Sequence, residues 1–282
     1  CFSDRGRMYW LKVWEVPQGS RTSRGKPIVN MFPLIEGEKI TVILPIKGYQ
    51  EDHFVFMATS LGTVKKTRLS DFSNPRKGGI IAVDLNENDF LVGAAITDGK
   101  HDVMLFSDAG KAVRFDENVV RPMGRTARGV RGMNLGPAQQ VIAMLVAPAE
   151  FTEVIVDGVV VSPAIALEGS ENVTTANVMG SVLTATENGF GKRTPIAEYT
   201  RHGRGTKGMI AIQTTERNGK VVAAALVSPD DQIMLITTGG VLVRTRVAEI
   251  REMGRATQGD TLINVDEGTR LSGLQRIAES DT

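Results

Sequence analysis

The sequence has very few of the residues that mark disulfide-bonded, zinc-binding or strongly aromatic proteins. Its 282 residues include one cysteine and three histidines, and aromatic residues make up 5%. One cysteine cannot form an intramolecular disulfide, and this set is too small for the common structural zinc sites. We therefore expect a protein of a reducing compartment, with no metal ion and no cofactor bound to this chain.

Long apolar runs are also missing. No run approaches the roughly 18 residues that cross a bilayer, and the chain does not open with the basic and then apolar leader of a secreted protein. Hydrophobic residues at 41% and charged residues at 23% are typical of a folded globular domain. We expect a cytoplasmic protein. Because the chain begins at Cys1 inside an expected strand, we interpret it as a piece of a longer polypeptide.

Motifs for catalysis are absent from the sequence. There is no G-x-S-x-G nucleophile elbow, and the acidic pair Asp230 and Asp231 falls in an expected turn, where such residues favour local hydrogen bonds. The histidines lie near expected turns and are interpreted as solvent-facing: His53, His101 and His202. No catalytic residue is assigned, and an enzyme site among these residues has no supporting cluster.

What the sequence does contain is a repeat. Five apolar stretches each run into a glycine, which we call an anchor glycine, and the spacings between these glycines are 56, 48, 79 and 51 residues. The anchor glycines are Gly6, Gly62, Gly110, Gly189 and Gly240. A second glycine follows 17 residues after the second anchor and 19 residues after each of the others. The second glycines are Gly25, Gly79, Gly129, Gly208 and Gly259.

Each repeat reads as four strands. The stretch after the anchor glycine alternates apolar and basic residues, as expected for a strand with one face in water. No helical periodicity persists beyond two turns, so the sequence predicts an all-β fold of four-stranded units. The spacing between most of the anchor glycines is typical of propeller-like blades. The expected repeats are about 1–50, 51–100, 101–148, 181–229 and 230–279. The first repeat is interpreted as shortened at its opening strand, and we expect preceding sequence to complete it.

Residues 149–180 interrupt this pattern. They contain five acidic residues and no Lys or Arg, and we interpret them as an insertion in one blade, with a hairpin around Asp157 and Gly158. In the repeats, the phenylalanines are interpreted as core residues: Phe56, Phe72, Phe106 and Phe115.

Positive charge is concentrated between the paired glycines. The five segments that run from anchor to second glycine, with one or two residues beyond in the first and third, hold 25 of the 33 basic and 7 of the 32 acidic residues. They carry a net charge of +18 and the rest of the chain −17, within a total of +1. Such segregation predicts that equivalent basic side chains of successive blades form one band along an edge.

A polyanion with regularly spaced charges is the natural partner of such a band. Neutralised phosphates release counterions and give affinity that falls with salt, and arginine binds phosphate oxygens in pairs. The few aromatics are not interleaved with the basic residues, which favours duplex DNA over single strands. The candidate DNA-binding residues are Arg21, Arg24, Lys26, Lys65, Lys66, Arg68, Arg76, Lys77, Arg114, Arg125, Arg128, Arg131, Arg193, Arg204, Lys207, Arg244, Arg246 and Arg255.

Several phrases resemble the C-terminal domain of the DNA gyrase A subunit, and they recur through all five repeats. Among them are FMATSLGTVKKTRLSDF, VMLFSDAGKAVRF, LTATENGFGKRTPIAEY and IMLITTGGVLVRTRVAEI. The resemblance implies a six-bladed β-pinwheel, in which neighbouring blades exchange strands and the basic outer edge wraps duplex DNA. It also implies that the isolated domain is a monomer and that the chain is part of a bacterial, nucleoid-associated enzyme.

The same resemblance implies how the chain would act in that enzyme. In a heterotetramer with the B subunit, which hydrolyses ATP with Mg²⁺, wrapping would support negative supercoiling. The family's catalytic tyrosine lies in another part of the A subunit, so Tyr9, Tyr49 and Tyr199 are not expected to cleave DNA. The family's Q-R-R-G-G-K-G box is absent, and residues 76–79 echo it only in part. Two alternatives stay open: the topoisomerase IV A subunit, and a propeller-like scaffold for acidic proteins.

Overall fold

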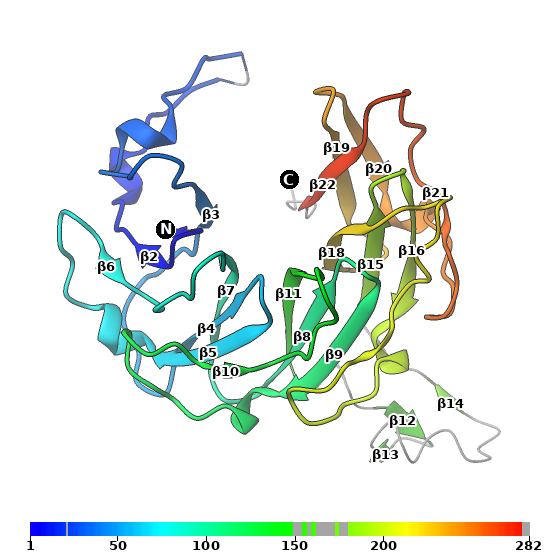
Figure 1. Cartoon of the computed structure of the whole chain (residues 1–282), viewed down its shortest axis with the longest axis horizontal. Helices are drawn as coiled ribbons and strands as arrows, with labels where there is room; N and C mark the ends of the chain where they lie inside the picture. The colour runs from blue at the N-terminus through cyan, green and yellow to red at the C-terminus, as the bar shows by residue number, and fades with distance from the viewer. Residues whose placement is uncertain (21, 149–153, 157–158, 162–172, 175–179, 278–282) are drawn as a thin grey trace. The chain divides into compact units, whose positions relative to one another are not determined.

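The computed structural model describes residues 1–20, 22–148, 154–156, 159–161, 173–174 and 180–277 (Figure 1). They form two compact units. The first unit comprises residues 1–99 and 120–132, and the second comprises residues 100–119 and 133–282. Within the described residues there are strands and short 3-10 turns and no α-helix, which confirms the all-β prediction. None of these elements is a helix long and apolar enough to cross a membrane.

The first unit contains two four-stranded antiparallel sheets, which we call blades 1 and 2. Their strand orders are β3-β1-β2-β6 and β10-β5-β4-β7. The strands are β1 (Phe2–Ser3), β2 (Arg7–Met8), β3 (Ile40–Val42), β4 (Phe54–Thr59), β5 (Thr63–Arg68), β6 (Ile80–Ile81), β7 (Leu91–Thr97) and β10 (Val130–Arg131). The 3-10 turns are η1 (Val13–Glu15), η2 (Ile28–Asn30) and η3 (Leu69–Phe72).

The second unit contains blades 3, 4 and 5. Their orders are β11-β8-β9-β17, β18-β15-β16-β21 and β20-β19-β22. The strands are β8 (His101–Ser107), β9 (Lys111–Asp116), β11 (Val141–Pro148), β15 (Ser181–Thr186), β16 (Phe190–Pro195), β17 (Met209–Ile210), β18 (Val221–Val227), β19 (Gln232–Thr237), β20 (Leu242–Arg246), β21 (Asp260–Thr261) and β22 (Leu271–Ile277). The 3-10 turns are η4 (Glu117–Val119), η6 (Ile196–Glu198) and η7 (Val247–Glu249).

A separate small sheet, β13-β12-β14, lies within the expected insertion. Its strands are β12 (Val154–Val156), β13 (Val159–Val161) and β14 (Val173–Thr174). Strand β12 pairs with β13 in antiparallel register, Val154 opposite Val161. The turn expected at residues 157–158, and most of the rest of 149–180, lie outside the described residues.

Four blades take their outermost strand from the following repeat. In blade 4, β16 pairs with β15 of its own repeat and with β21, which lies after the next anchor glycine. Strands β6, β10 and β17 complete blades 1, 2 and 3 in the same way. We call β6, β10, β17 and β21 the exchanged strands. The exchange, which the sequence suggested only through a family resemblance, is present within each unit.

The anchor glycines close the first hairpin of each blade. Each takes a positive φ, between 74° and 87°, and its N–H donates to the carbonyl three residues earlier, as Gly189 does to Thr186 at 3.0 Å. A tight turn followed by a left-handed residue is a common hairpin geometry that favours glycine. The glycine carbonyl then accepts the exchanged strand: Leu262 and Ile263 donate to Gly189 at 2.8 and 3.2 Å.

Close approach of the exchanged strand gives these glycines a second requirement. A Cβ built on Gly189 would lie 2.2 Å from the Ile263 carbonyl oxygen, and one on Gly259 would lie 2.6 Å from that of Gly191. At Gly240 and Gly25 an added Cβ would meet no described atom within 4 Å. Among the described residues, Gly240 is the anchor glycine that receives no exchanged strand, and Gly25 is the second glycine that is followed by none.

The opening strand of the first repeat is short, as expected: β1 spans two residues, whereas its counterparts β4 and β15 span six. The missing exchanged strand, however, falls in the last repeat. Blade 1 has four strands, whereas blade 5 has three among the described residues, because no exchanged strand pairs with β20. In the first repeat, the segment equivalent to an exchanged strand was expected to be extended but forms the 3-10 turn η2. An extended segment needs a neighbouring strand to satisfy its backbone hydrogen-bonding groups. Within the described part of the chain, no blade lies close enough to Gly25 to provide one.

Apolar side chains of the 3-10 turns join successive blades. Phe72, from the second repeat, lies edge-on to Phe2 of blade 1, with ring centroids 6.0 Å apart, and Tyr199 lies 5.9 Å from Phe106 of blade 3. All four rings are at most 1% exposed. At η1 the pattern fails, because Val13 is 83% exposed. The predicted core role of the four phenylalanines is confirmed, since none exceeds 1% exposure: Phe56, Phe72, Phe106 and Phe115.

Blade 5 is held at its start by an ion pair. Arg276 Nε lies 2.6 Å from a carboxylate oxygen of Asp231, and the Ser228 N–H donates to the same carboxylate at 2.8 Å. Burial acts to raise the pKa of Asp231, but the hydrogen bonds from Arg276 and Ser228 outweigh it and lower the pKa. Asp231 therefore stabilises the folded state above the ordinary carboxyl pKa.

The two glycines Gly189 and Gly240 provide a test of strand exchange. Both have φ near +85°, at 87° and 81°, so G189A and G240A each incur the left-handed penalty of about 1–2 kcal/mol. Only G189A drives a Cβ into the exchanged strand, so we expect it to lower the free energy of unfolding by roughly 2–5 kcal/mol. Chemical denaturation of both variants measures the difference, and equal losses would contradict the role assigned to the exchange.

The Asp231 pair predicts a defined pH dependence. We expect D231N to destabilise the second unit at neutral pH by about 1–3 kcal/mol, because Arg276 loses a charged acceptor. The difference between wild type and D231N should shrink as pH falls from about 4 through the lowered pKa of Asp231. Urea unfolding at several pH values measures it. A difference that stays constant down to the acid limit would show that the carboxylate charge does not contribute.

Candidate nucleic-acid interface

The basic segments lie along one edge of each blade. In the first unit β3 packs against β7, and in the second unit β18 packs against both β11 and β22, so these last strands of each repeat form the inner side. At the opposite edge of blades 1 to 4 lies the exchanged strand, beside the strand that follows the anchor glycine. In the second to fifth repeats, the segments between anchor and second glycine therefore line this outer edge, whereas the turn that ends at Gly25 in the first repeat reaches no blade among the described residues.

Eleven of the candidate residues are exposed, and three are half-buried; of these, Arg24 and Lys26 belong to the turn of the first repeat and the others to this outer edge. The exposed residues are Arg24, Lys26, Arg68, Arg76, Lys77, Arg128, Arg131, Arg204, Lys207, Arg244 and Arg246. The half-buried residues are Arg125, Arg193 and Arg255. Arg21 lies outside the described residues. Side chains of this outer edge, from the strand after the anchor glycine to the exchanged strand, are called the basic edge below.

Three candidate residues lie inside the blades and are removed from the proposed set. Lys65, Lys66 and Arg114 are 1%, 2% and 3% exposed, which leaves no surface on which a phosphate could reach them. Lys66 Nζ lies 4.2 Å from the ring centroid of Phe54. The alternation of the sequence failed here because contacts from other segments cover these positions. Lys65 lies against the turn that contains Arg125, Lys66 lies over the Phe54 ring, and Arg114 is enclosed by groups of the fourth repeat.

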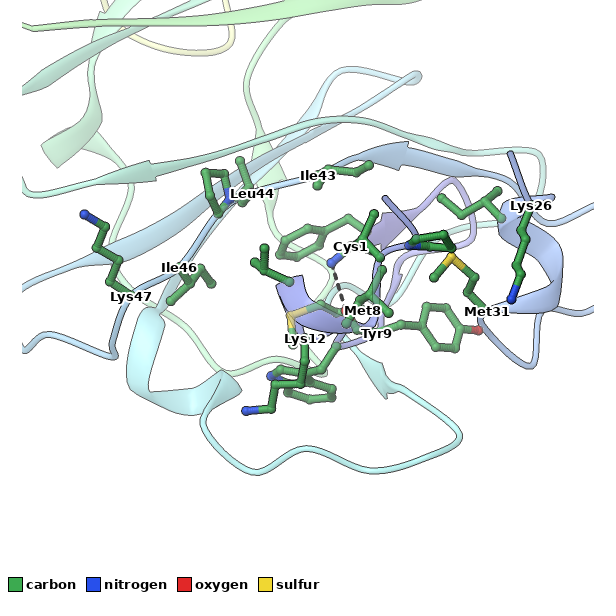
Figure 2. A pocket seen from close by; sticks show the side chains of 18 of the residues that line it. Cys1, Met8, Tyr9, Lys12, Lys26, Met31, Ile43, Leu44, Ile46 and Lys47 are labelled. Atoms are coloured by element: carbon green, nitrogen blue, oxygen red, sulfur yellow. Dashed lines mark hydrogen bonds between the residues drawn. The ribbon is translucent and has the colours of Figure 1, made fainter. Parts of the chain in front are cut away.

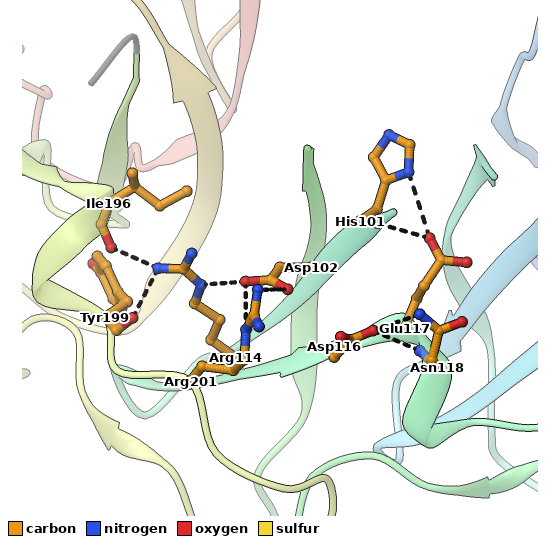
Figure 3. A network of polar contacts seen from close by, with 9 residues as sticks. All are labelled: His101, Asp102, Arg114, Asp116, Glu117, Asn118, Ile196, Tyr199 and Arg201. Atoms are coloured by element: carbon orange, nitrogen blue, oxygen red, sulfur yellow. Dashed lines mark hydrogen bonds and ion pairs between the residues drawn. The ribbon is translucent and has the colours of Figure 1, made fainter. Parts of the chain in front are cut away.

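Arg114 belongs to a buried polar network (Figure 3). Its Nε lies 2.9 Å from the Asp102 carboxylate, and its Nη1 donates to the carbonyls of Ile196 and Tyr199 at 3.0 and 2.9 Å. Arg201, 43% exposed, lies 2.7 Å from the same carboxylate. Burial lowers the pKa of Arg114 and Asp102 opposes that shift. This guanidinium joins the third and fourth repeats and is enclosed by protein groups.

The half-buried arginines link successive turns of the edge. In the first unit, Arg125 Nη1 donates to the Ile81 carbonyl at 3.0 Å, and the Asp84 N–H donates to the Ala127 carbonyl at 3.3 Å. In the second unit, Arg255 Nη1 donates to Ile210 at 2.7 Å. Each bond joins a turn to the exchanged strand of the preceding repeat. Within each unit, basic turns of consecutive repeats therefore lie side by side.

Few carboxylates neutralise the edge among the described residues. Arg128 pairs with Asp84 at 3.0 Å, and Arg251 with Asp260 at 3.5 Å, but the four side chains are between 49% and 72% exposed. Exposed pairs of this kind contribute about 0–1 kcal/mol, so phosphates can compete for these guanidinium groups.

Two exposed arginines were missed by the sequence-based set. Arg121 and Arg251 both lie eleven residues after their anchor glycine and are exposed. Their recurrence at one repeat position was the signal that could have found them. Neither is buried by the exchanged strand, so both join the basic edge.

The remaining polar and hollow features do not form a catalytic arrangement among the described residues. His101 was expected to face solvent, but it is 21% exposed and its Nδ1 lies 3.4 Å from the buried Glu117. That expectation was wrong. The first unit contains a cavity of about 630 Å³, and Tyr9, Met31 and Leu44 are among the residues that line it (Figure 2). The charged side chains among its described lining residues are lysines, so it offers no acid–base pair.

Comparisons with known proteins agree with this architecture. The family model described as "DNA gyrase C-terminal domain, beta-propeller" matches residues 1–47, 53–98, 101–148, 180–228 and 231–278. The DNA gyrase A subunit of Haemophilus influenzae is 49% identical over 281 residues, which is 100% of this chain and 32% of that protein. The Salmonella typhimurium protein of the same name is 50% identical over 99% of this chain and 28% of its own length.

Solved structures show the same fold. The C-terminal domain of a DNA topoisomerase IV superposes with a TM-score of 0.80, covering 98% of this chain and 77% of that one. A DNA gyrase A C-terminal domain superposes with a TM-score of 0.76, covering 98% and 81%. Both are 23% identical in sequence. The chain spans about a third of the full-length relatives it matches. On this evidence, the chain belongs to the DNA gyrase A C-terminal domain family.

Proposed function

We propose that this chain is a non-catalytic domain that binds, bends and wraps duplex DNA. The observation that supports it is the basic edge, where the turns of consecutive repeats lie side by side within each unit and expose arginines and lysines. Each phosphate bound there would release counterions, and the affinity would not depend on base sequence. Bending a duplex around such an edge costs several kcal/mol, which many phosphate contacts offset.

The wider role proposed for it comes from the relatives. They are DNA gyrase A subunits, and gyrase is a type II topoisomerase. We propose that the domain works in the cytoplasm, on the bacterial nucleoid, as part of a heterotetramer of A and B subunits. In that enzyme ATP and Mg²⁺ would act at other sites, and the catalytic tyrosine would come from outside this chain. Wrapping would then support negative supercoiling by the whole enzyme.

A second candidate is the corresponding domain of topoisomerase IV. A solved topoisomerase IV domain shares the fold at 23% identity, whereas the 49% identity to a gyrase A subunit favours gyrase. The two differ in how strongly the domain is proposed to wrap DNA. A topological measurement on DNA therefore distinguishes them better than a binding constant.

Charge reversal on the basic edge should weaken DNA binding uniformly. We expect R125E/R128E and R204E/K207E to lower affinity for all duplex sequences, and to reduce the slope of log K against log salt by roughly one unit per lost phosphate contact. Titrations of labelled duplexes at several salt concentrations measure both. The control is K39E, at an exposed lysine outside the basic edge. A sequence-selective loss, or an equal loss in K39E, would contradict the proposal.

Wrapping should leave a topological signature. We expect that nicked circular DNA, religated in the presence of the protein, shows a shift in linking number that grows with protein concentration and is lost at high salt. R125E/R128E should reduce the shift. Binding without a shift would exclude wrapping and favour the topoisomerase IV assignment. Binding that survives high salt unchanged would exclude the phosphate-contact model itself.

A further inference from the structure

Two lysines of equivalent position are buried beneath the basic edge. Lys65 and Lys192 each lie three residues after an anchor glycine, on β5 of blade 2 and β16 of blade 4, and are 1% and 0% exposed. A buried ammonium group is costly unless hydrogen bonds replace its water. Their partners therefore show what each charge accomplishes.

All but one of the partners lie in the basic turn of the next repeat; the exception, Ala82, belongs to the same repeat as Lys65. Lys65 Nζ donates to the carbonyl of Ala82 at 2.5 Å and to the carbonyl of Arg125. Lys192 Nζ donates to the carbonyls of Gly254 and Arg255 at 2.6 and 2.5 Å. It also donates to the Thr257 hydroxyl at 3.0 Å. Both lysines thus reach the main chain of the arginine fifteen residues after the next anchor glycine.

That same arginine is bound from its other end. The guanidinium of Arg125 donates to Ile81, and that of Arg255 donates to Ile210, each through one Nη1. A guanidinium carries five N–H donors in a fixed fork, so further donors are available for a phosphate. The lysine holds the main chain of the turn in place. The bond from the guanidinium sets the direction in which the arginine side chain points.

The stability of the blade does not explain these lysines. In blades 3 and 5 the same position holds Val113 and Val243, so the fold accepts an apolar side chain there. Burial is the largest cause that lowers the pKa of Lys65 to about 7 and that of Lys192 to about 8, so burying these charges costs free energy. What the lysines add is a bond to the basic turn.

We propose that Lys65 and Lys192 are positioning residues for DNA binding, which hold the turns of Arg125 and Arg255 in the geometry that meets the phosphates. The proposal rests on the DNA-binding function proposed above. It deepens that function, because part of the affinity comes from preorganisation of two turns by charges that never touch the DNA. Blade 3 has Val113 at the equivalent position. The turn at residues 201–207, in the repeat that follows, therefore has no such lysine beneath it and serves as an internal reference.

The test uses K65M, K192M and the double variant, since methionine fills the space of lysine without its charge. We expect amide hydrogen exchange to become about tenfold faster in residues 121–129 for K65M and 251–258 for K192M, toward the rate of 201–207. We expect duplex affinity to fall about tenfold in the double variant. The two turns must then become ordered on binding, and this loss of conformational entropy reduces the binding free energy. The unfolding temperature should stay the same or rise.

Two controls separate the possible causes. K39M removes one exposed charge outside the basic edge, so an equal affinity loss there would assign the effect to net charge and overturn the proposal. K65V and K192V repeat the test with the residue that blades 3 and 5 contain, should a methionine variant fail to fold. Faster exchange throughout a unit, together with a lower unfolding temperature, would assign the lysines a purely structural role and also overturn it.

The remaining outcomes are equally decisive. Unchanged exchange in both turns would show that the lysines do not hold them. Faster exchange with unchanged DNA affinity would show that turn order does not contribute to binding. If the wild type itself fails to bind duplex DNA, the proposed function fails, and the exchange data still report whether the lysines hold the turns.

Discussion

Blades 1 to 4 depend on hydrogen bonds between the anchor glycine and the exchanged strand of the next repeat. Three strands from one repeat leave an edge with unpaired backbone groups, which are costly to leave unsatisfied. The following repeat covers that edge, and its N–H groups donate to the glycine carbonyl, as Ala211 does to Gly110 at 2.8 Å. Glycine is required there twice over, for its positive φ and for the close carbonyl.

The exchange also arranges the charges. Each exchanged strand brings along the turn before it, so the turn's basic side chains reach the outer edge of the preceding blade. There they join those of the strand after the anchor glycine. Arg125 and Arg255 then connect each turn to its neighbour through backbone carbonyls. One backbone device therefore both completes the sheets and gathers the positive charge, which is why the glycine spacing and the charge segregation share a period.

Much of the fold followed from the sequence, because glycine spacing and apolar periodicity are local signals. The exposure of single basic residues did not follow. Lys65 and Lys66 are neighbours on β5 and should face opposite sides of the strand, yet both are buried. One lies under the turn that contains Arg125 and the other against Phe54. Arg125 is 60 residues further along the chain than the lysine it covers, and no local pattern predicts such a contact.

Buried and exposed arginines differ in what they contribute to stability. Arg114 lies inside, where a carboxylate and two carbonyls satisfy it, and removing it would leave Asp102 with a buried charge and one fewer partner. Arg128 lies outside, where its pair with Asp84 is solvated and contributes little to stability. A set of segments with net charge +18 repels itself, and the exposed arginines gain little from the blades in return. Under the proposed function, a polyanion would neutralise this cluster, and the buried lysines would order that edge before the polyanion binds.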